Sequence, residues 1–370
     1  MTRYLTILSI FLFSGCYVGE ELPPDQNVWE YGLPREFSMS ETDLFSIDTR
    51  LSNRENGQIN SLIIIKDDHL VFENYYNGYK RPTIQKIDRA TNAVTTLVLG
   101  LLIEDGLIPN IDVAIKDYLP DYQDIFEGDD QKSQITIRHI LNHKSGLPWD
   151  EYITHPENVN SDFQEMRAKS DWCRHILGLP MEAPPGLRIV LNSGASIILS
   201  SIFQNALGET KLETYIDEKL FQPMDITNYE WEYDPSGNLN LGRGLSLNTI
   251  DFTKLGYLML LEGRWSDRSR IINRDWVLDS QELHILLNEQ FGFGYGWWAF
   301  TDQFEQQRFR GYDTYFLSGS LGQNLYVVPE LNFIVAIAGE NFFNSTIYNP
   351  SLDIFIRCLA TITSTTGSEI

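Results

Sequence analysis

The sequence feature that most constrains the fold is residues 90–104, A-T-N-A-V-T-T-L-V-L-G-L-L-I-E. Apolar residues recur there at helical spacing and leave almost no polar face, and a helix that is hydrophobic all round is buried inside a protein. A chain of 370 residues can form a sizeable core and two subdomains around it. We therefore expect a central buried helix over residues 90–104.

Short runs that favour β-structure lie on both sides of this helix. Residues 62–66 and 70–76 are joined by Asp67 and Asp68, which is a hairpin signal. Residues 109–289 alternate helical patterns with loops that contain Pro and Gly, and predict a mostly helical subdomain. Further strands are expected at 295–300, 324–328 and 333–338, and a final helix at 348–361. The order of strands, helices, strands and helix places both ends of the chain on one sheet.

The N-terminus has the features of a targeting segment. Arg3 gives a basic start, and residues 4–13 are apolar but too few to cross a bilayer as a helix. Residues 13–16, F-S-G-C, resemble the cleavage site of bacterial lipoproteins. We therefore expect residues 1–15 to be removed and Cys16 to carry a lipid that anchors the chain in the bacterial cell envelope, facing the periplasm or the exterior. A plain secretory signal cleaved nearby is the alternative.

Residues 16–39 are rich in Pro, Glu, Asp and Asn without periodicity, and predict a flexible tether. The folded domain is then expected at 40–365, with the helical subdomain of about 109–289 inserted in it. Two cysteines remain in this domain, Cys173 and Cys358. They could form a disulfide in an oxidising compartment or serve as separate apolar side chains. The helical apolar pattern around Cys358 favours separate cysteines.

Charge and residue spacing exclude several classes of partner. The chain has 28 Lys and Arg against 51 Asp and Glu, a formal net charge of −23. Nucleic-acid binding requires clustered basic residues, so we expect no nucleic-acid partner, and solubility is the simplest consequence of the charge. His139 and His143 have the spacing of a metal-binding pair, but no third ligand accompanies them. We expect no metal and no cofactor.

Residues 83–106, T-I-Q-K-I-D-R-A-T-N and the apolar run that follows, resemble the segment that opens the active site of serine β-lactamase-like and penicillin-binding-protein-like hydrolases, related to class C β-lactamases. Five later blocks follow in the order that this family requires, at 135–149, 184–194, 248–263, 291–298 and 317–329. The resemblance covers roughly residues 40–360. It implies an α/β fold of the α+β type, in which N- and C-terminal helices flank an antiparallel sheet and a mostly helical subdomain is inserted.

The resemblance also implies that the groups that move protons are missing. The family's nucleophilic Ser, and the Lys one helical turn later, correspond to Arg89 and Asn92. Arginine is no oxygen nucleophile, and an amide takes up no proton at neutral pH. The Tyr of the second motif, Y-x-N, corresponds to Val190, whereas its Asn is retained as Asn192. We therefore regard Arg89, Asn92 and Val190 as degenerate positions of the catalytic motifs. We assign no catalytic residue.

The third motif retains only its backbone features. It reads L-S-G-S, so the cation or aromatic residue of relatives is absent while Gly319 remains. The oxyanion donors would be the backbone N–H groups of Arg89 and Ser320, and we expect them to persist because they do not depend on side chains. The predicted ligand cleft consists of Arg89, Asn92, Asn192, Leu317, Ser318, Gly319 and Ser320.

Three functions remain open at this point. The favoured one is a catalytically inactive protein that acts as a binding or scaffolding module, with a small carboxylate or peptide-like ligand held near Arg89. Arg89 could instead pair with an acidic neighbour such as Asp88. The second is an active esterase, amidase or carboxypeptidase that uses a non-family nucleophile, although the candidate hydroxyls, Ser193 among them, have no evident base. The third is a structural protein whose cleft has closed.

The lipidation hypothesis predicts the behaviour of a Cys16→Ala variant. Without the thiol that carries the lipid, the chain should stay uncleaved or leave the membrane fraction. Fractionation and gel mobility of the expressed full chain measure both outcomes. A variant that partitions into membranes and migrates as the wild type does would contradict the assignment.

Overall fold

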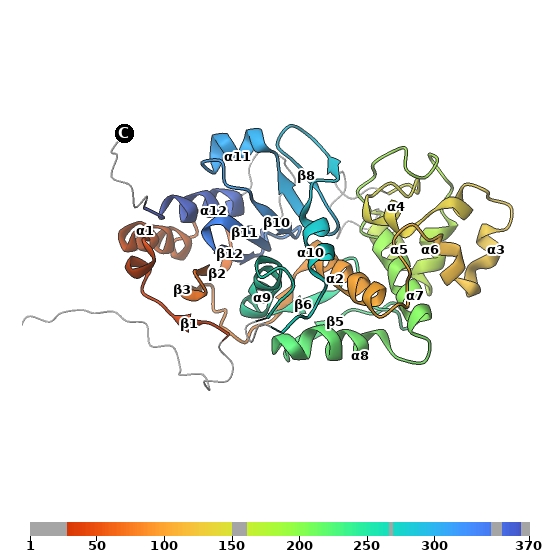
Figure 1. The fold of residues 1–370 in the computed structure, drawn as a ribbon, viewed down its shortest axis with the longest axis horizontal. Coiled ribbons are helices and arrows are strands. Elements are labelled where there is room, and N and C mark those ends of the chain that lie inside the picture. The colour runs from red at the N-terminus through yellow and green to blue at the C-terminus, as the bar shows by residue number, and fades with distance from the viewer. Residues whose placement is uncertain (1–27, 150–160, 266–268, 342–349, 364–370) are drawn as a thin grey trace, which may run out of the picture.

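The computed structural model describes residues 28–149, 161–265, 269–341 and 350–363. A part built on a large sheet lies at one end, and a mostly helical part lies at the other (Figure 1). The expected mixed α/β architecture with a large antiparallel sheet is confirmed. The predicted signal segment and Cys16 lie outside the described residues. No helix of the described residues is both long and apolar enough to cross a membrane.

The large sheet has nine strands in the order β1-β3-β2-β12-β11-β10-β9-β8-β7. Every neighbouring pair is antiparallel except β1 and β3, which are parallel. The sheet therefore combines strands from both ends of the chain, as expected. Its strands are β1 Glu30–Tyr31, β2 Ile59–Lys66, β3 His69–Tyr75, β7 Ile285–Leu286, β8 Phe291–Phe293, β9 Trp298–Phe300, β10 Tyr315–Ser318, β11 Asn324–Val328 and β12 Phe333–Gly339.

Two predicted segments differ from the observed structure. Residues 28–39 are not part of a loose tether, because Trp29 is buried against the ring of Tyr257 and β1 pairs with β3. The predicted strand 295–300 is shorter, since Gly294 donates its N–H to the carbonyl of Trp297 and only β9 continues the sheet. The hairpin of β2 and β3 is confirmed, with positive φ at both Asp67 and Asp68.

Helices cover both faces of the large sheet. Helices α1 (Glu41–Ser52) and α12 (Pro350–Ala360) pack together on one face, and α9 (Thr249–Leu260) packs on the other. All eight residues of β2 are consequently buried. Within the predicted insertion of 109–289, α9 and β7 thus belong to the sheet part. Cys358 in α12 and Cys173 in α6 are buried and unpaired, which confirms their prediction as separate cysteines.

The other elements lie between the two parts or in the helical part. The three-stranded sheet β4-β6-β5 begins with a strand just before the buried helix and pairs residues far apart in the chain. Its strands are β4 Gln85–Lys86, β5 Tyr229–Trp231 and β6 Leu245–Leu247, and the remaining α-helices are α3 Gln123–Phe126, α4 Ile137–Leu141, α5 Asp162–Arg167, α6 Trp172–Gly178, α7 Ala195–Leu207, α8 Leu212–Ile216, α10 Arg274–Gln281 and α11 Asp302–Arg308.

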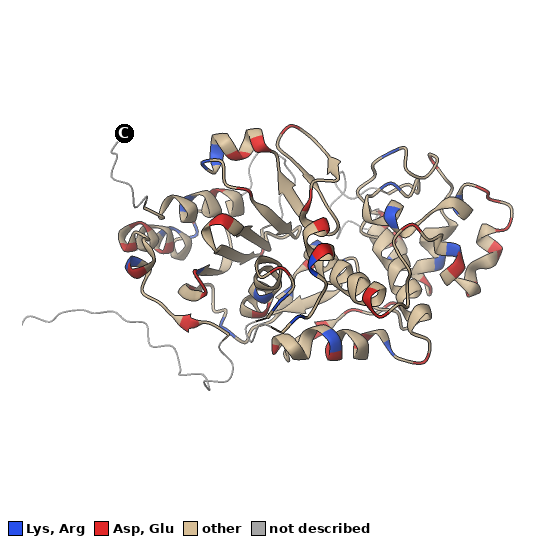
Figure 2. Ribbon diagram, viewed as in Figure 1, with Lys and Arg blue, Asp and Glu red and all other residues tan. Residues whose placement is uncertain are grey.

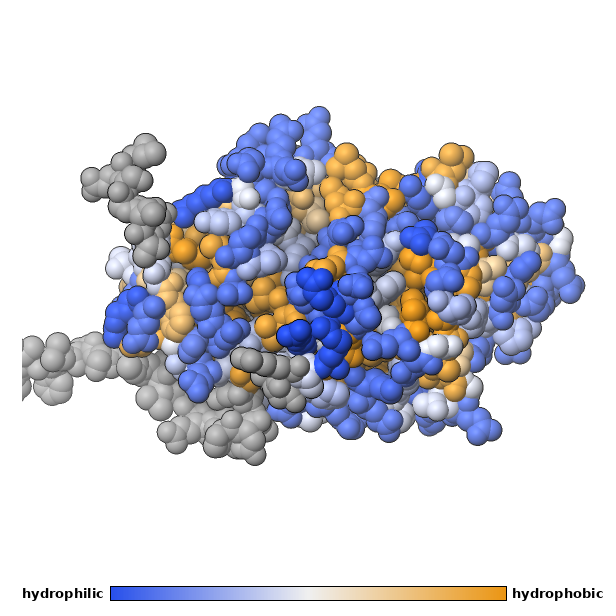
Figure 3. Space-filling view, in the orientation of Figure 1, coloured by the Kyte–Doolittle hydropathy of each residue, from blue (hydrophilic) through white to orange (hydrophobic). Residues whose placement is uncertain are grey.

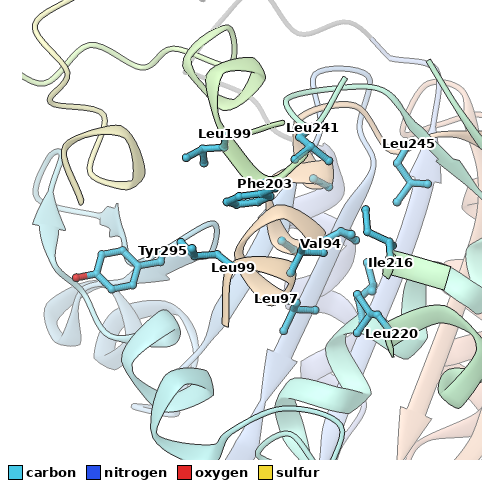
Figure 4. Close-up of a cluster of buried hydrophobic side chains, with 14 of the residues drawn as sticks. Val94, Leu97, Leu99, Leu199, Phe203, Ile216, Leu220, Leu241, Leu245 and Tyr295 are labelled. Carbon is cyan, nitrogen blue, oxygen red and sulfur yellow. The ribbon is translucent and has the colours of Figure 1, made fainter. Parts of the chain in front are cut away.

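Helix α2 (Thr91–Glu104) is the predicted central helix, and eleven of its residues are buried. Its side chains Val94, Leu97 and Leu99 lie among apolar residues of α7, α8 and the loop before β6 (Figure 4). Burying one such side chain stabilises the fold by about 1.5–3 kcal/mol. The helix therefore has a fixed position between the sheet part and the helical part.

Charged residues are distributed over the helices and loops of both parts (Figure 2). Several of them form exposed ion pairs, such as Arg174 with Asp124 and Arg138 with Asp112. The face shown in Figure 3 is mainly hydrophilic, with smaller apolar areas between the charged groups. This distribution is consistent with a soluble domain that has a large negative net charge.

Gly296 and Gly106 provide a matched test of the packing around α2. Both have positive φ, +74° and +72°, but a Cβ at Gly296 would lie 2.6 Å from the carbonyl oxygen of Asn92, whereas Gly106 has no neighbour within 4 Å. Gly106→Ala should cost about 1 kcal/mol of unfolding free energy through its backbone alone. Gly296→Ala should cost about 1–3 kcal/mol more, because the backbone of α2 must shift. Urea unfolding measures both, and equal losses would contradict this packing.

Candidate functional site

The site begins where a short 3-10 turn, Asp88–Ala90, leads into α2. Asp88 has a φ of +54°, and its carbonyl oxygen accepts a hydrogen bond from Thr91 Oγ1 at 2.6 Å. Asp and Asn adopt this left-handed conformation more readily than most residues. The turn places Arg89 and Asn92 one helical turn apart, in the positions predicted for a nucleophile and its lysine.

Asn92 is held by hydrogen bonds between helices. Ser196 Oγ donates to Asn92 Oδ1 at 2.6 Å, and Asn92 Nδ2 donates to the carbonyl oxygen of Arg89 at 3.1 Å. Ser196 lies on α7 and is buried. Because an amide oxygen takes up no proton at neutral pH, this contact gives Ser196 no base. Asn92 therefore joins α2 to α7 and moves no proton.

The second motif supplies a helix cap and an amide donor. Asn192 Oδ1 accepts the N–H of Ala195 at 2.9 Å, which caps α7, and the Asn192 N–H donates to His143 Nδ1 at 3.3 Å. Asn192 is only 2% exposed, and its Nδ2 has no hydrogen-bond partner among the described residues. Val190 donates its N–H to the carbonyl oxygen of His143. The alkyl side chain of Val190 brings no exchangeable proton to the site.

The third motif packs closely against the turn before α2. Leu317 is buried in the core, and Ser318 pairs with Asn324 of the next strand. Gly319 donates its N–H to the carbonyl oxygen of Gln323 at 2.7 Å. A Cβ at Gly319 would lie 2.7 Å from the carbonyl oxygen of Ile87, so only glycine allows this approach.

Ser320 corrects the expectation that both oxyanion donors are available. Its backbone N–H donates to Asp88 Oδ2 at 2.5 Å. A carboxylate of the protein itself therefore occupies the donor that would stabilise a substrate oxyanion. The sequence does not indicate this contact, because Asp88 and Ser320 are brought together only by the approach of the turn to the end of β10.

Arg243 completes this arrangement and was also missed from the sequence. Its Nε donates to Asp88 Oδ1 at 2.6 Å, with side chains only 7% and 9% exposed, and its Nη2 donates to Ser320 Oγ at 3.2 Å. The guanidinium lies over the ring of Phe163, 4.6 Å from its centre. These contacts join α2, the loop before β6 and the end of β10. We call the three residues Asp88, Arg243 and Ser320 the buried carboxylate cluster.

The loop that carries Arg243 has its own sequence signal, an arginine between two glycines. A Cβ at Gly242 would lie 2.2 Å from the carbonyl oxygen of Ser193, and one at Gly244 would lie 2.6 Å from the carbonyl oxygen of Asn240. Thr95 Oγ1 of α2 donates to the carbonyl oxygen of Leu241 at 2.7 Å. The glycines thus allow the loop to lie against its neighbours, and α2 fixes its position.

The charge state of Asp88 follows from its surroundings. Burial alone would raise the pKa of its carboxyl group, but the charges of Arg243 and Arg89 and the hydrogen bonds from Ser320 lower it from the ordinary 3.8 to about 2. Asp88 is therefore an anion at neutral pH. Its charge is balanced inside the protein.

A small pocket lies beside the start of α2, where Arg89 and Asn92 line it. It has a volume of about 40 Å³, room for a few water molecules. Of the predicted cleft residues, Arg89, Asn92 and Asn192 line it, whereas Leu317, Ser318, Gly319 and Ser320 do not. We call it the Arg89 pocket, lined by Arg89, Asn92, His143, Leu191, Asn192, Ser193, Phe293, Gly294, Gly296, Trp297 and Trp298.

Three further residues have local roles. Lys86, in the segment 83–106, lies on β4 and pairs with Glu232 at 3.3 Å. His139 accepts the N–H of Thr136 and His143 accepts that of Asn192, so each histidine uses Nδ1 locally. Within the described part of the chain, no group of three His, Cys, Asp or Glu is arranged to hold a metal ion.

The fold is shared with penicillin-binding-protein-like serine hydrolases. A sequence model of the Beta-lactamase family matches residues 60–346, and the chain belongs to this family. A candidate 6-aminohexanoate-dimer hydrolase from Bacillus anthracis shares the fold with a TM-score of 0.71 and 14% identity, over 91% of this chain and 88% of that one. An octameric penicillin-binding protein homologue from Pyrococcus abyssi has a TM-score of 0.63 and 21% identity, over 86% and 76%.

One curated relative is an N-acetylmuramyl-L-alanine amidase of Bacillus subtilis (strain 168). It is 24% identical over 185 residues, which cover 45% of this chain and 40% of the relative. The chain thus spans less than half the length of this relative.

The buried carboxylate cluster predicts a large loss of stability in Asp88→Asn. The substitution leaves Arg243 buried without its counter-ion, which should lower the unfolding free energy at pH 7 by about 3–5 kcal/mol. Asp124→Asn removes the partner of Arg174 in an exposed ion pair and should change stability little. Chemical denaturation measures both variants, and similar effects would contradict a dominant role for the cluster.

The effect of Asp88→Asn on the unfolding free energy should depend on pH. Because the folded pKa of Asp88 is lowered, its ionisation stabilises the fold fully above pH 4–5, and this contribution disappears as the pH falls toward 2. The difference from the ordinary pKa corresponds to about 2–3 kcal/mol. The difference in unfolding free energy between the wild type and Asp88→Asn should therefore become smaller below about pH 4. If this difference in unfolding free energy stays constant down to pH 2, Asp88 does not titrate as described.

Proposed function

We propose that this member of the Beta-lactamase family is catalytically inactive and acts as a binding or scaffolding module of the cell envelope, anchored by a lipid on Cys16. The observation that carries the proposal is the hydrogen bond from the Ser320 N–H to the Asp88 carboxylate. Acyl transfer in this fold develops negative charge on a carbonyl oxygen, which needs free donors. Here one donor already binds an anion, and that anion would repel a second one.

The side chains support the same proposal. Arg89 occupies the place of the nucleophile, Asn92 that of the lysine and Val190 that of the tyrosine. Loss of a single oxyanion donor reduces kcat by about 10²–10³ in serine hydrolases, and nucleophile and base act as a unit. A site that lacks all of these groups retains only its capacity to bind.

The second candidate is an active hydrolase of esterase, amidase or carboxypeptidase type with a non-family nucleophile. Its support is the similarity to proteins described as an amidase and as a dimer hydrolase. Among the described hydroxyls at the site, Ser196 donates to the amide oxygen of Asn92 and Thr91 to a backbone carbonyl. Neither contact supplies a base.

Covalent labelling distinguishes the two candidates. We expect no stoichiometric adduct when the wild-type chain is incubated with a labelled penicillin or a fluorophosphonate, because the described contacts of Ser196 and Thr91 supply no base. Intact-protein mass spectrometry with peptide mapping measures the result. An adduct on any Ser or Thr of the site would contradict the proposal and establish the hydrolase.

A restored site provides the matched control. The triple variant Arg89→Ser, Asn92→Lys, Val190→Tyr should remain unlabelled, because Asp88 still occupies the Ser320 N–H. Adding Asp88→Gly, which suits the positive φ, should permit slow labelling if the variant folds. Rapid labelling of the triple variant alone would show that Asp88 does not block the oxyanion donor.

A further inference from the structure

Glu305 on α11 carries a buried carboxyl group that the candidate site does not use. The residue is only 4% exposed, and its Oε1 accepts the backbone N–H of Thr314 at 2.7 Å. Among the described residues, no Lys, Arg or His forms an ion pair with it. A buried carboxylate without a counter-ion is costly, whereas the protonated group is neutral. We infer that Glu305 is a pH-dependent switch, which holds residues 302–314 against β9 and β10 when it is protonated and lets them open more often when it is ionised.

The groups around this carboxyl group add negative charge. Asp302 lies on the same helix, Asp313 lies in the loop before β10, and Glu330 lies in the 3-10 turn after β11. Each of the three carboxylates raises the pKa of Glu305. Tyr326 and Cys358, which belong to the same core, are neutral at neutral pH because burial raises the pKa of both side chains.

The cations of the neighbouring segments are directed elsewhere. Arg308 is exposed on α11, and Arg310 donates to the carbonyl oxygen of Ile362 at 3.2 Å. Arg357 of α12 pairs with Asp353 of the same helix at 2.9 Å. Among the described residues, the ionised carboxyl group would therefore have one backbone N–H as its partner and no cation.

The direction of the switch follows from the pKa of Glu305. Burial raises this pKa most, the Thr314 N–H opposes the rise, and the neighbouring carboxylates add to it, so that the pKa is about 7 instead of 4.5. When residues 302–314 open, water surrounds the carboxyl group and its pKa returns toward 4.5. Between these values the closed state retains the proton and the open state releases it. Opening therefore becomes easier as the pH rises from about 4.5 to about 7, and changes little above that.

Three backbone amides at the end of this segment converge on Glu305. Its carbonyl oxygen accepts the N–H of Phe309 at 2.7 Å and that of Gly311 at 3.0 Å, and its side chain accepts that of Thr314. The helix α11 has only 7 residues, and a helix this short depends on tertiary contacts for its stability. Weaker packing of Glu305 therefore exposes these amides together.

A row of aromatic rings connects α11 to the candidate site. Phe304 of α11 stacks on Phe300 of β9 with ring centres 5.1 Å apart, and Phe300 stacks on Phe316 of β10 at 4.5 Å. Phe316 in turn stacks on Trp298 at 6.1 Å, and Trp298 lines the Arg89 pocket. Opening of residues 302–314 thus removes support from one wall of this pocket, whether or not the protein is a catalyst.

Hydrogen exchange of the full chain between pH 5 and pH 8 tests the switch. Protection factors correct for the pH dependence of the chemical exchange rate, and those of residues 302–314 should fall by about tenfold or more over this range. They should also be lower than those of α2 at every pH, because the segment opens without global unfolding. Protection factors that stay constant or rise from pH 5 to pH 8 would overturn the inference.

Glu305→Gln removes the charge and keeps an oxygen that can accept the Thr314 N–H. Its protection factors should match those of the wild type at pH 5 and remain the same at pH 8. Glu330→Gln is the matched control, because Glu330 also accepts a backbone N–H of this segment, that of Asp313 at 3.2 Å, but is exposed. It should retain most of the wild-type fall. A fall that persists in Glu305→Gln, or is lost in Glu330→Gln, would contradict the assignment to Glu305.

Urea unfolding gives a second readout. Glu305→Gln should be more stable than the wild type at pH 8 and about equally stable at pH 5, because only the ionised carboxyl group is costly. Equal destabilisation at both pH values would show that Glu305 has a structural role alone and would overturn the switch. If the variant does not fold, the protection factors of the wild type between pH 5 and pH 8 decide the question.

Discussion

The buried ion pair between Asp88 and Arg243 is the interaction on which the arrangement of this site depends. It connects the turn before α2 to the loop before β6, and the Ser320 N–H adds the end of β10. Removing one member of such a pair typically costs about 3–5 kcal/mol, because a buried charge remains uncompensated. Replacing the whole pair by apolar groups can be neutral, so its presence indicates that it positions these three segments as well as stabilising them.

The buried carboxylate cluster and the Arg89 pocket are separate parts of the candidate site, because none of the three cluster residues lines the pocket. At the end of β10 the Asp88 carboxylate accepts the Ser320 N–H, and a Cβ at Gly319 would lie 2.7 Å from the carbonyl oxygen of Ile87. The Arg89 pocket is lined by Arg89 and Asn92, by residues 191–193 and by residues between 293 and 298, and none of its described lining residues is acidic.

Local patterns predicted the elements that do not depend on distant partners. The apolar run at 90–104 predicted α2, because a helix with no polar face has to be buried, and Asp67-Asp68 predicted the hairpin of β2 and β3. The prediction of a flexible tether was wrong for residues 28–39, because it rested on their polar composition. Trp29 is buried against Tyr257 and fixes the position of this segment. Composition describes an average, whereas one buried indole decides where a short segment packs.

The sequence by itself determined the family, the mixed α/β fold and the identities of Arg89, Asn92 and Val190, since each depends on residues in a fixed order along the chain. Only the tertiary structure decided that Ser320 donates to Asp88, that Arg243 balances this carboxylate, and that Asn192 lines a pocket without Leu317 or Gly319. Asp88 and Arg243 are 155 positions apart, and Asp88 and Ser320 are 232 apart. No periodicity or spacing rule relates residues at such separations, because their contact is created by the packing of the sheet part against the helical part.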